Sequence, residues 1–368
     1  MKKVLILATS SSGLYGFRNE LLLALLKEYQ VHVSLPDDTN NEQLKEEGCH
    51  IYYTSLNRRG MNPIQDMGLL KSYIELIKMI RPDVVLTYTI KPNVYGGLAC
   101  RILKVPYIAN ITGLGSALEN GGLLQKIALL LYKIGLKKAS CVFLQNEYNM
   151  QFFKGHRITK AKKRRIPGSG VNVEKFLLMP MPQDVVGDKE QCSEFLYISR
   201  VMKEKGIEQY LATAKYIHEK YPNTKFHILG YCEEDYLEIL KNEEKSGNIC
   251  YHGSVLDVRP YMEKCQCLIH PSFYPEGMSN VCLEAASSGR VVITTKRPGC
   301  FETVEDGKTG YLVSEQNTEE LIGAVERFIH LPYEDKKKMG LAGREKMSTE
   351  FDRQIIVNAY LEEIRSVI

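Results

Sequence analysis

The sequence predicts an α/β protein made of two Rossmann-like domains, each with a parallel sheet covered by helices on both faces. Short apolar runs, typical of buried strands, alternate with segments of helical periodicity. This alternation restarts after residue 190. The chain has 368 residues, which is too long for one ordinary core and suits two domains of about 170–190 residues each.

In the first half of the chain, the pattern alternates strictly between the two kinds of element. Such alternation favours a parallel sheet, because each crossover helix returns the chain across one face. Residues 4–8 follow two lysines but are too few for a signal peptide, so they are expected to form the first strand. The expected strands are 4–7, 31–35, 51–54, 84–88, 107–110 and 141–144, and the expected helices are 17–28, 43–47, 64–80, 93–103 and 123–139.

The second half repeats the pattern. Residues 177–192 contain two prolines and no periodicity, which predicts a linker between a first domain of residues 1–176 and a second of residues 193–350. A last helix is expected near residues 353–367. The other expected strands are 194–199, 225–229, 249–251, 267–270 and 291–295, and the other expected helices are 206–221, 234–245, 258–264 and 281–288.

Composition excludes several classes of protein. The net charge of +4 gives no indication of nucleic-acid binding. The ten cysteines are scattered through a long chain, which argues against a disulfide framework, and Cys265 and Cys267 alone rarely make a zinc site. No apolar run approaches the length of a membrane span, so we expect a cytoplasmic protein.

Residues 270–289 carry the most informative pattern of the chain. Glu276 and Glu284 stand eight positions apart where a glycine-bearing loop opens a helix. Helix N-termini attract anions, so the amides of Gly277, Met278, Ser279 and Asn280 are expected to hold phosphates. Eight helical residues span about 12 Å, which is the scale of a diphosphate, so each Glu is expected to accept from hydroxyls at one end of a nucleotide diphospho-sugar.

Other candidates follow from the rule that open α/β sheets bind ligands at the carboxyl ends of their strands. With two such domains, the ligand site is expected in the cleft between them. Arg200 and Lys205 are expected to stabilise the charge of a departing diphosphate. Arg200 would do so through the paired N–H donors of its planar guanidinium group, and Lys205 as a point charge. The remaining strand-end candidates are Ser199 and Gly230 in the second domain and Gly13 and Gly16 in the first.

Four segments together resemble one known family. Residues 270–289 match an E-x7-E signature, residues 197–207 (YISRVMKEKGI) match an R-x4-K-G element, and residues 299–312 (GCFETVEDGKTGYL) and 167–176 (PGSGVNVEKF) match further blocks. In this order they resemble the retaining glycosyltransferase family 4, which has the GT-B fold. The resemblance implies that Glu276 contacts the transferred sugar and Glu284 the ribose, and that residues 351–368 cross back to the first domain. It also favours UDP over GDP.

The resemblance implies a hexosyltransferase that moves a hexose or N-acetylhexosamine without an obvious protein nucleophile. Many family members place a histidine where this chain has Thr112, so the role of Thr112 and its loop stays open. Lys91 and Asn93 end another strand and are expected to meet an anionic acceptor. No D-x-D motif follows a strand, and Asp37, Asp38 and residues 233–235 look solvated. No metal or cofactor is therefore expected beyond the nucleotide-sugar cosubstrate.

The acceptor is suggested by basic residues. Lys126, Lys133 and Lys137 form one stripe of an apolar helix, and residues 160–165 hold a second basic cluster. Such stripes are often solvated, but beside apolar residues they also hold proteins on anionic lipid. The overall look resembles bacterial capsule and lipid-linked oligosaccharide transferases. That resemblance implies a polyprenyl-diphosphate-linked glycan acceptor and peripheral contact with the inner face of the plasma membrane.

Two alternatives remain open and one is disfavoured. A GT-B nucleotide-sugar 2-epimerase would act on the donor alone, and a non-catalytic sensor would only bind it. The R-x4-K-G and E-x7-E blocks favour the transferase over both. A nicotinamide oxidoreductase is disfavoured because no G-x-G-x-x-G pattern follows the first strand.

Overall fold

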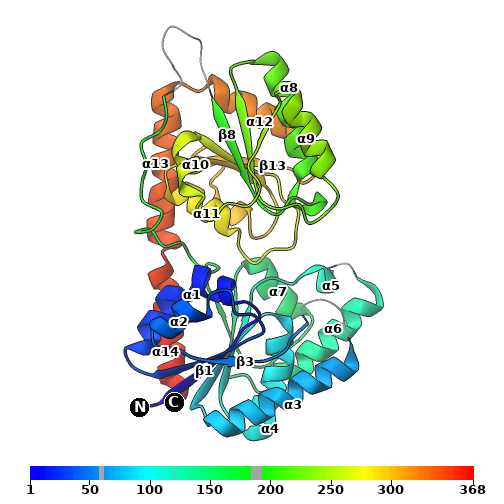
Figure 1. Ribbon diagram of the computed structural model, residues 1–368, viewed down its shortest axis with the longest axis vertical. Coiled ribbons are helices and arrows are strands. Elements are labelled where there is room, and N and C mark those ends of the chain that lie inside the picture. The colour runs from blue at the N-terminus through cyan, green and yellow to red at the C-terminus, as the bar shows by residue number, and fades with distance from the viewer. Residues whose placement is uncertain (58–61, 120, 184–192) are drawn as a thin grey trace. The chain divides into compact units, whose positions relative to one another are not determined.

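The computed structural model describes residues 1–57, 62–119, 121–183 and 193–368, which form two compact units (Figure 1). Unit 1 comprises Met1–Gly170, Glu276–Met278 and Arg353–Ile368, and unit 2 comprises Val171–Pro275 and Ser279–Asp352. The continuous part of unit 1 thus ends at Gly170, whereas the sequence pattern placed the end of the first domain at residue 176. Of the expected linker, residues 184–192 lie outside the described residues.

Unit 1 is built on a seven-stranded sheet in the order β3-β2-β1-β4-β5-β6-β7, and every pair of neighbours is parallel. The predicted parallel α/β architecture is therefore confirmed. The strands are β1 (Lys3–Leu7), β2 (Gln30–Leu35), β3 (His50–Tyr53), β4 (Val84–Tyr88), β5 (Tyr107–Ile111), β6 (Cys141–Leu144) and β7 (Lys162–Arg165). The helices are α1 (Ser11–Leu26), α2 (Asn41–Glu46), α3 (Pro63–Ile80), the π-helix η1 (Pro92–Gly96), α4 (Gly97–Leu103), α5 (Ser116–Glu119), α6 (Gly122–Gly135), α7 (Glu147–Gly155) and α14 (Arg353–Val367).

Several unit 1 elements differ from the sequence expectation, and the short helices α5 and α7 were not expected at all. The first helix begins at Ser11 rather than at residue 17, because the Ser10 side chain caps it by accepting from the amide of Gly13 at 3.2 Å. Strand β7 was not expected, since Lys162–Arg165 contains no apolar residue. It lies at the edge of the sheet, where its cations pair with carboxylates on α14 and α7.

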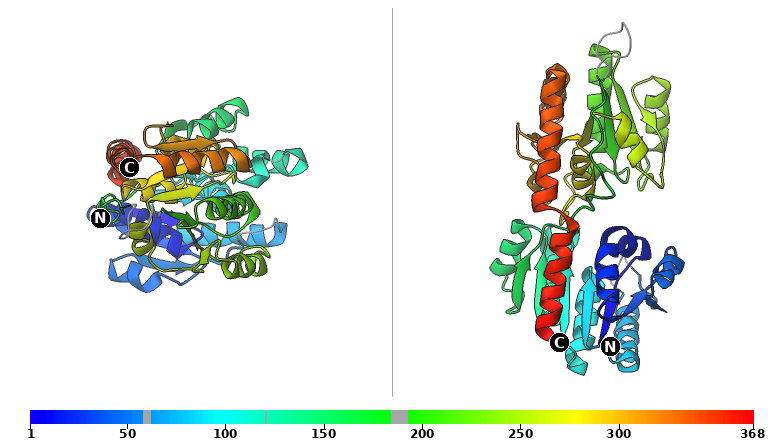
Figure 2. Two further views of the ribbon diagram at one scale, coloured as in Figure 1. Left: turned by 90° about the horizontal axis from the view of Figure 1, so that it is seen from above. Right: turned by 90° about the vertical axis from the view of Figure 1, so that its left-hand side faces the viewer.

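The C-terminal helix α14 completes the core of unit 1. It lies beside α1 (Figure 2) and buries Ile356, Val357, Tyr360 and Ile364, with the Tyr360 ring against Tyr88 of β4 and Phe143 of β6. The Tyr360 hydroxyl accepts from Asn110 Nδ2 at 2.6 Å. The helix therefore supplies both apolar surface and a buried hydrogen bond to a sheet that is otherwise formed by the first part of the chain.

Unit 2 contains a six-stranded parallel sheet in the order β10-β9-β8-β11-β12-β13. Together with unit 1 this gives the two parallel-sheet domains that the sequence predicted. The strands are β8 (Glu194–Ile198), β9 (Lys225–Leu229), β10 (Cys250–Tyr251), β11 (Cys267–His270), β12 (Val291–Thr295) and β13 (Gly310–Val313). The helices are η2 (Lys203–Lys205), α8 (Ile207–Lys220), α9 (Leu237–Lys245), α10 (Arg259–Lys264), α11 (Asn280–Ser287), η3 (Phe301–Thr303), α12 (Thr318–His330) and α13 (Tyr333–Glu350).

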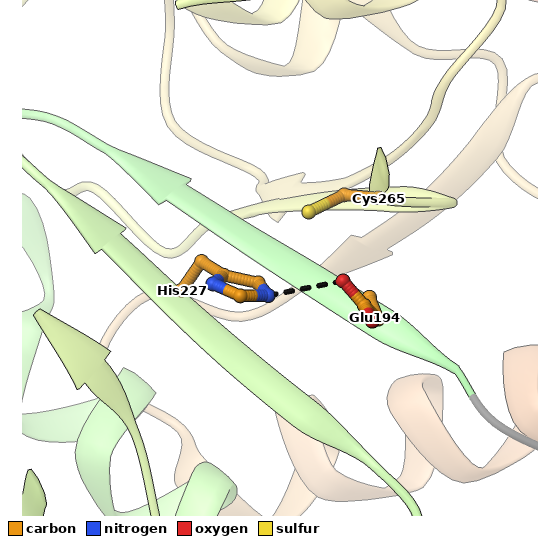
Figure 3. A group of neighbouring side chains, drawn as sticks. All are labelled: Glu194, His227 and Cys265. Carbon is orange, nitrogen blue, oxygen red and sulfur yellow. Dashed lines mark hydrogen bonds and ion pairs between the residues drawn. The ribbon is translucent and has the colours of Figure 1, made fainter. Parts of the chain in front are cut away.

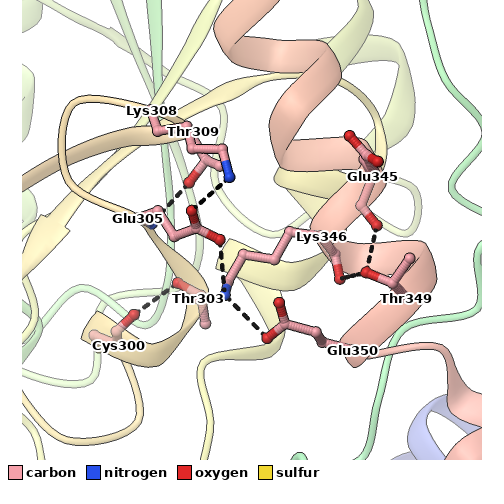
Figure 4. Close-up of polar contacts among 9 residues, drawn as sticks. All are labelled: Cys300, Thr303, Glu305, Lys308, Thr309, Glu345, Lys346, Thr349 and Glu350. Carbon is pink, nitrogen blue, oxygen red and sulfur yellow. Dashed lines mark hydrogen bonds and ion pairs between the residues drawn. The ribbon is translucent and has the colours of Figure 1, made fainter.

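The loop between β12 and β13 is fastened to α13 by a network of charges (Figure 4). Lys346 on α13 reaches Glu305 at 3.5 Å and Glu350 at 3.0 Å, and Lys308 pairs with the same Glu305 at 2.8 Å. The side chain of Lys346 is only 11% exposed, so its two carboxylate partners compensate a largely desolvated charge. In the described parts of the chain, no helix has the length and apolar character that crossing a bilayer requires.

Candidate functional site

The strand order of unit 2 creates a switch point between β8 and β11. From β8 the chain continues to β9 and β10 on one side, and from β11 it continues to β12 and β13 on the other. The loops after two such strands diverge and leave a crevice at the carboxyl edge of the sheet, which is where open α/β proteins bind ligands. Here those loops are residues 199–205 after β8 and residues 271–275 after β11.

Tyr274 brings the two predicted cations together at this switch point. The guanidinium carbon of Arg200 lies 5.3 Å from the centre of the Tyr274 ring, and Nζ of Lys205 lies 4.8 Å from it. Both distances are within the range of cation–π attraction. The sequence patterns singled out Arg200 and Lys205 but missed Tyr274, although an aromatic residue two positions before Glu276 was a visible signal.

Lys205 is an unusually buried cation. It ends the 3-10 turn η2 and is only 8% exposed. Burial lowers the pKa of its ammonium group to about 8, and the nearby positive charge of Arg200 acts in the same direction. A strongly shifted pKa at the carboxyl edge of a sheet is a physical indicator of a functional site.

Arg200 is held by a carboxylate as well as by the ring. Its guanidinium forms an ion pair with Glu233, whose side chain is 14% exposed. Burial disfavours the charge on Arg200, but the ion pair with Glu233 outweighs it and raises the pKa of Arg200. The expectation that Glu233 is solvated was therefore wrong, because its distance of 33 residues from Arg200 hid the pairing.

Two glycines let the strand-end loops approach each other. Gly206 follows Lys205 with φ +75°, and a Cβ there would stand 2.2 Å from the carbonyl oxygen of Pro271. Gly230 has φ +142°, and its Cβ would stand 1.7 Å from the carbonyl oxygen of Ser199. Both positions therefore exclude any side chain, and the close approach of two strand ends accounts for Gly230 and Ser199 without a ligand.

At the N-terminus of α11, one of the backbone amides that were expected to bind phosphate already donates to another part of the protein. Ser279 caps the helix, and its amide donates to the carbonyl of Gly299 at 2.7 Å. That amide is used inside the protein, so the expectation that it binds phosphate was wrong. Asn280 begins the helix and Glu284 follows one turn later, and both are half-buried.

The other residues of the E-x7-E loop belong to unit 1. Asn146, which caps α7, donates through Nδ2 to the carbonyl of Gly277 at 2.7 Å and to that of Glu276 at 3.3 Å. Glu276 is half-buried, and Met278 is only 8% exposed. The loop is thus positioned through its backbone carbonyls, and Met278 is a packing residue in unit 1.

The remaining candidates of unit 1 are spread over three segments. Gly13 and Gly16 lie inside the first turns of α1 rather than in the turn before it. Thr112 follows β5 and is exposed. Asn93 is fully buried, where it accepts from Thr87 Oγ1 at 2.6 Å and donates to the Asn110 carbonyl at 2.8 Å. The expectation that Asn93 meets an acceptor was wrong, because the core uses its side chain.

Lys91 forms a nearly buried ion pair in the wall of a pocket. Its Nζ lies 2.8 Å from Asp66, with side chains that are 12% and 9% exposed, and the hydroxyl of Tyr95 donates to the same carboxylate at 2.9 Å. The charge of Lys91 is thus balanced within the protein. The pocket has a volume of about 330 Å³ and is lined by Ser55, Leu56, Asn57, Gln65, Asp66, Gly68, Leu69, Ser72 and Lys91.

A separate group lies at the amino end of β8, away from the switch point (Figure 3). Glu194, His227 and Cys265 bring potential metal-ligand atoms within 4.8 Å of one another. His227 Nε2 is hydrogen-bonded to Glu194 at 3.1 Å, and burial raises the pKa of the Cys265 thiol. Because metals bind the thiolate rather than the thiol, the bond between His227 and Glu194 is the simpler account of this group.

Comparison with family models assigns both halves of the chain. Residues 184–346 match the model described as glycosyl transferases group 1, and residues 3–146 match the model described as glycosyl transferase 4-like. The first match contains the switch point of unit 2, and the second contains most of the sheet of unit 1. Together they cover most of the chain.

Curated relatives align over nearly the full length. The chain is 26% identical to the N,N'-diacetylbacillosaminyl-diphospho-undecaprenol alpha-1,3-N-acetylgalactosaminyltransferase of Campylobacter jejuni, with 98% of each chain covered. It is 25% identical to the capsular polysaccharide biosynthesis glycosyltransferase CapM of Staphylococcus aureus, over 96% of this chain and 94% of CapM. These relatives are similar to the whole protein rather than to one of its domains.

Solved structures agree on the fold. HepE of Anabaena, crystallised with UDP and glucose, superposes with a TM-score of 0.80 at 18% identity over all of both chains. The sucrose-phosphate synthase of Thermosynechococcus elongatus gives a TM-score of 0.80 at 17% identity, covering 100% of this chain and 99% of the other. From the two family models and the two parallel-sheet units, we conclude that the protein is a glycosyltransferase of family 4 with the GT-B fold.

Proposed function

We propose that the protein is a retaining, metal-independent transferase that moves a hexose or N-acetylhexosamine from a UDP-sugar to a polyprenyl-diphosphate-linked glycan. This reaction would serve the synthesis of capsule or another bacterial surface polysaccharide. One observation carries the proposal for the donor: Arg200 and Lys205 converge on the ring of Tyr274 at the switch point of unit 2.

The chemistry follows from the charge that the leaving group acquires. When the bond between sugar and diphosphate breaks, negative charge grows on the phosphate oxygens. Arg200 and Lys205 stabilise this charge more than that of the intact donor, which lowers the barrier. Lys205 has little water to lose when the anion arrives, because burial has already removed it. Two fixed cations supply the charge neutralisation that other transferases obtain from a divalent ion.

The proposed acceptor is supported by the names of relatives. The Campylobacter enzyme is named for a diphospho-undecaprenol acceptor. A galactosyltransferase of Escherichia coli, 27% identical over 73% of this chain, is named for UDP-Gal and for GlcNAc-diphosphoundecaprenol. We therefore propose that this enzyme acts at the inner face of the bacterial plasma membrane. The pocket beside Lys91 and Asp66 has no net charge from that pair, so it suits sugar hydroxyls of the acceptor better than its diphosphate.

Thermal unfolding with a panel of nucleotides tests the donor. A ligand at 100 times its dissociation constant adds about 2.7 kcal/mol to stability. We expect UDP and one UDP-sugar, each with excess EDTA, to raise the melting temperature more than GDP does. Glu276→Ala is expected to keep the UDP shift but to lose turnover. A requirement for magnesium in turnover, or equal shifts with GDP, would contradict the proposal.

Product analysis tests the reaction itself. Nuclear magnetic resonance of the product should show the same anomeric configuration as the donor sugar. Incubation of the UDP-sugar without acceptor separates the transferase from the 2-epimerase alternative. We expect no new nucleotide sugar, whereas an epimerase would produce one at full rate.

A further inference from the structure

Helix α6 of unit 1 exposes an apolar face. Leu123, Leu124, Ile127 and Leu130 are 74%, 45%, 36% and 58% exposed. Three of them, Leu123, Ile127 and Leu130, recur at the spacing that places residues on one side of a helix. The opposite side of α6 holds the buried Ala128, Tyr132 and Gly135, which pack into the core of the unit. The core side of α6 is thus already packed, and the exposed apolar residues form a second, separate face.

Lysines accompany this face without compensating acids. Lys126, Lys133, Lys137 and Lys138 are all exposed, and none of them forms an ion pair with another described residue. No Asp or Glu occurs between residues 121 and 146. The second basic cluster of the sequence differs in this respect, because on β7 Lys162 and Arg164 pair with Glu363 at 2.5 and 3.1 Å.

We propose that the α6 face, defined as Leu123, Leu124, Ile127, Leu130 and the lysines at 126, 133, 137 and 138, docks the protein on an anionic lipid bilayer. The apolar side chains enter the boundary between headgroups and acyl chains, and the lysines meet the negative surface. The inference rests on the proposed function, whose acceptor is held in lipid. A second copy of the chain is a poor occupant, since two α6 faces would bring their uncompensated lysines together.

Flotation with vesicles tests the docking without any substrate. The full-length protein is mixed with vesicles of phosphatidylcholine, with or without 40% phosphatidylglycerol, at low and high salt. Two double variants probe the surface: Leu123→Ser with Leu130→Ser, and Lys126→Ser with Lys133→Ser. Two matched controls lie in unit 2: Leu237→Ser with Leu256→Ser at exposed leucines, and Lys215→Ser with Lys245→Ser, which removes the same charge from exposed lysines.

We expect binding to vesicles that contain phosphatidylglycerol, with partition falling at least tenfold for either double variant and less than twofold for the controls. High salt should weaken binding of the parent protein. Circular dichroism should be unchanged, since the substituted side chains are exposed. Two results would overturn the proposal: equal partition of variant and control, or a parent dimer in size-exclusion chromatography that the leucine variant converts to monomers.

Activity separates this inference from the proposed function. With a water-soluble short-chain acceptor, the α6 variants should keep the turnover of the parent, because the face takes no part in donor binding. With the long-chain acceptor in vesicles, the turnover of the α6 variants should fall by roughly the same factor as their partition onto vesicles. An inactive parent with normal vesicle binding would refute the proposed reaction and leave the docking surface intact.

Discussion

Lys205 is the residue whose chemistry should be most visible in a pH profile. Its pKa is lowered to about 8 by burial, so the free enzyme loses this cation as the pH rises above 8. The kcat/KM for the donor reports on groups of the free enzyme and should therefore fall tenfold per unit well above that pH. Lys205→Arg, which stays charged, should remove this fall even if its overall rate is lower.

The same shift makes a prediction about stability. The pKa is about 8 in the folded state against 10.5 for an ordinary lysine, so between these values the unfolded chain binds more protons. The parent protein should gain stability as pH rises through this window. The free energy of unfolding of Lys205→Met, measured with urea, should exceed that of the parent by up to about 3 kcal/mol at neutral pH. This difference should vanish near pH 10.5. Lys203→Met, on an exposed lysine of the same turn, should show no such trend.

Tyr274 should act by positioning the two cations. Tyr274→Leu removes the ring that Arg200 and Lys205 share and should weaken UDP binding about tenfold in calorimetry, as two cation–π contacts predict. Tyr274→Phe keeps the ring face and should stay within about threefold of the parent. Equal losses in both variants would assign the effect to the hydroxyl and contradict the role of the ring.

At this scale the sequence could single out residues but not their partners. Arg200 and Lys205 stand in a recognisable block, so their chemistry was predictable from type and spacing. Glu233 lies 33 residues from Arg200, and nothing in its neighbours indicates the pairing. Asn93 failed as an acceptor residue for a similar reason, because its hydrogen-bond partner Asn110 belongs to the next strand.

Among the elements, the turn that ends η2 is fixed by a glycine. At Gly206 a methyl group would stand 2.2 Å from the Pro271 carbonyl, in a backbone conformation with φ +75°. Gly206→Ala should therefore push apart the loops after β8 and β11, costing about 3 kcal/mol or more in urea unfolding. Gly253→Ala is the matched control, because it has φ +65° and nothing within 4 Å of its Cβ, and it should cost about 1 kcal/mol. Equal costs would show that the close approach is unimportant.

The periodicity of side chains predicted most elements that have an apolar face but not all of them, since α12 was not expected although it buries Leu321, Ala324, Val325, Phe328 and Ile329. Strands β4, β6, β9, β11 and β12 have the expected bounds because each is a short run in which apolar residues predominate. Helix α13 was not expected, since Met339 and Met347 are the only apolar side chains it buries. The rest of its inner face is Lys336, Gly340 and Gly343, and a buried lysine with two glycines gives no apolar stripe.

At the scale of the whole molecule, the restart of one pattern after residue 190 predicted two parallel sheets. The sequence could not give the strand order, because parallel neighbours are joined by long crossovers and the pattern does not say on which side of the sheet each crossover returns. The switch point between β8 and β11 therefore came only from the structure. That order explains why Arg200 and Tyr274, which are 74 residues apart in the sequence, lie at one site.

The dependence of unit 1 on the last helix gives a prediction for the whole chain. A protein that stops at residue 352 loses α14 and exposes the sheet face that Ile356, Tyr360 and Ile364 cover. It also loses the ion pair of Arg353 with Glu20 at 2.7 Å. Hydrogen exchange should then accelerate in β4, β5 and β6 of unit 1, whose Tyr88, Asn110 and Phe143 contact Tyr360, while β8, β9 and β12 of unit 2 keep their protection.

A matched control is a protein that stops after residue 366, which removes only two terminal residues and should exchange like the full chain. The shorter protein should also unfold in two thermal steps, with only the unit 1 step lowered. UDP should still raise the melting temperature of the unit 2 step, because Arg200, Lys205 and Tyr274 all lie in that unit. Loss of protection in both units alike would mean that α14 stabilises the chain as a whole rather than the core of unit 1.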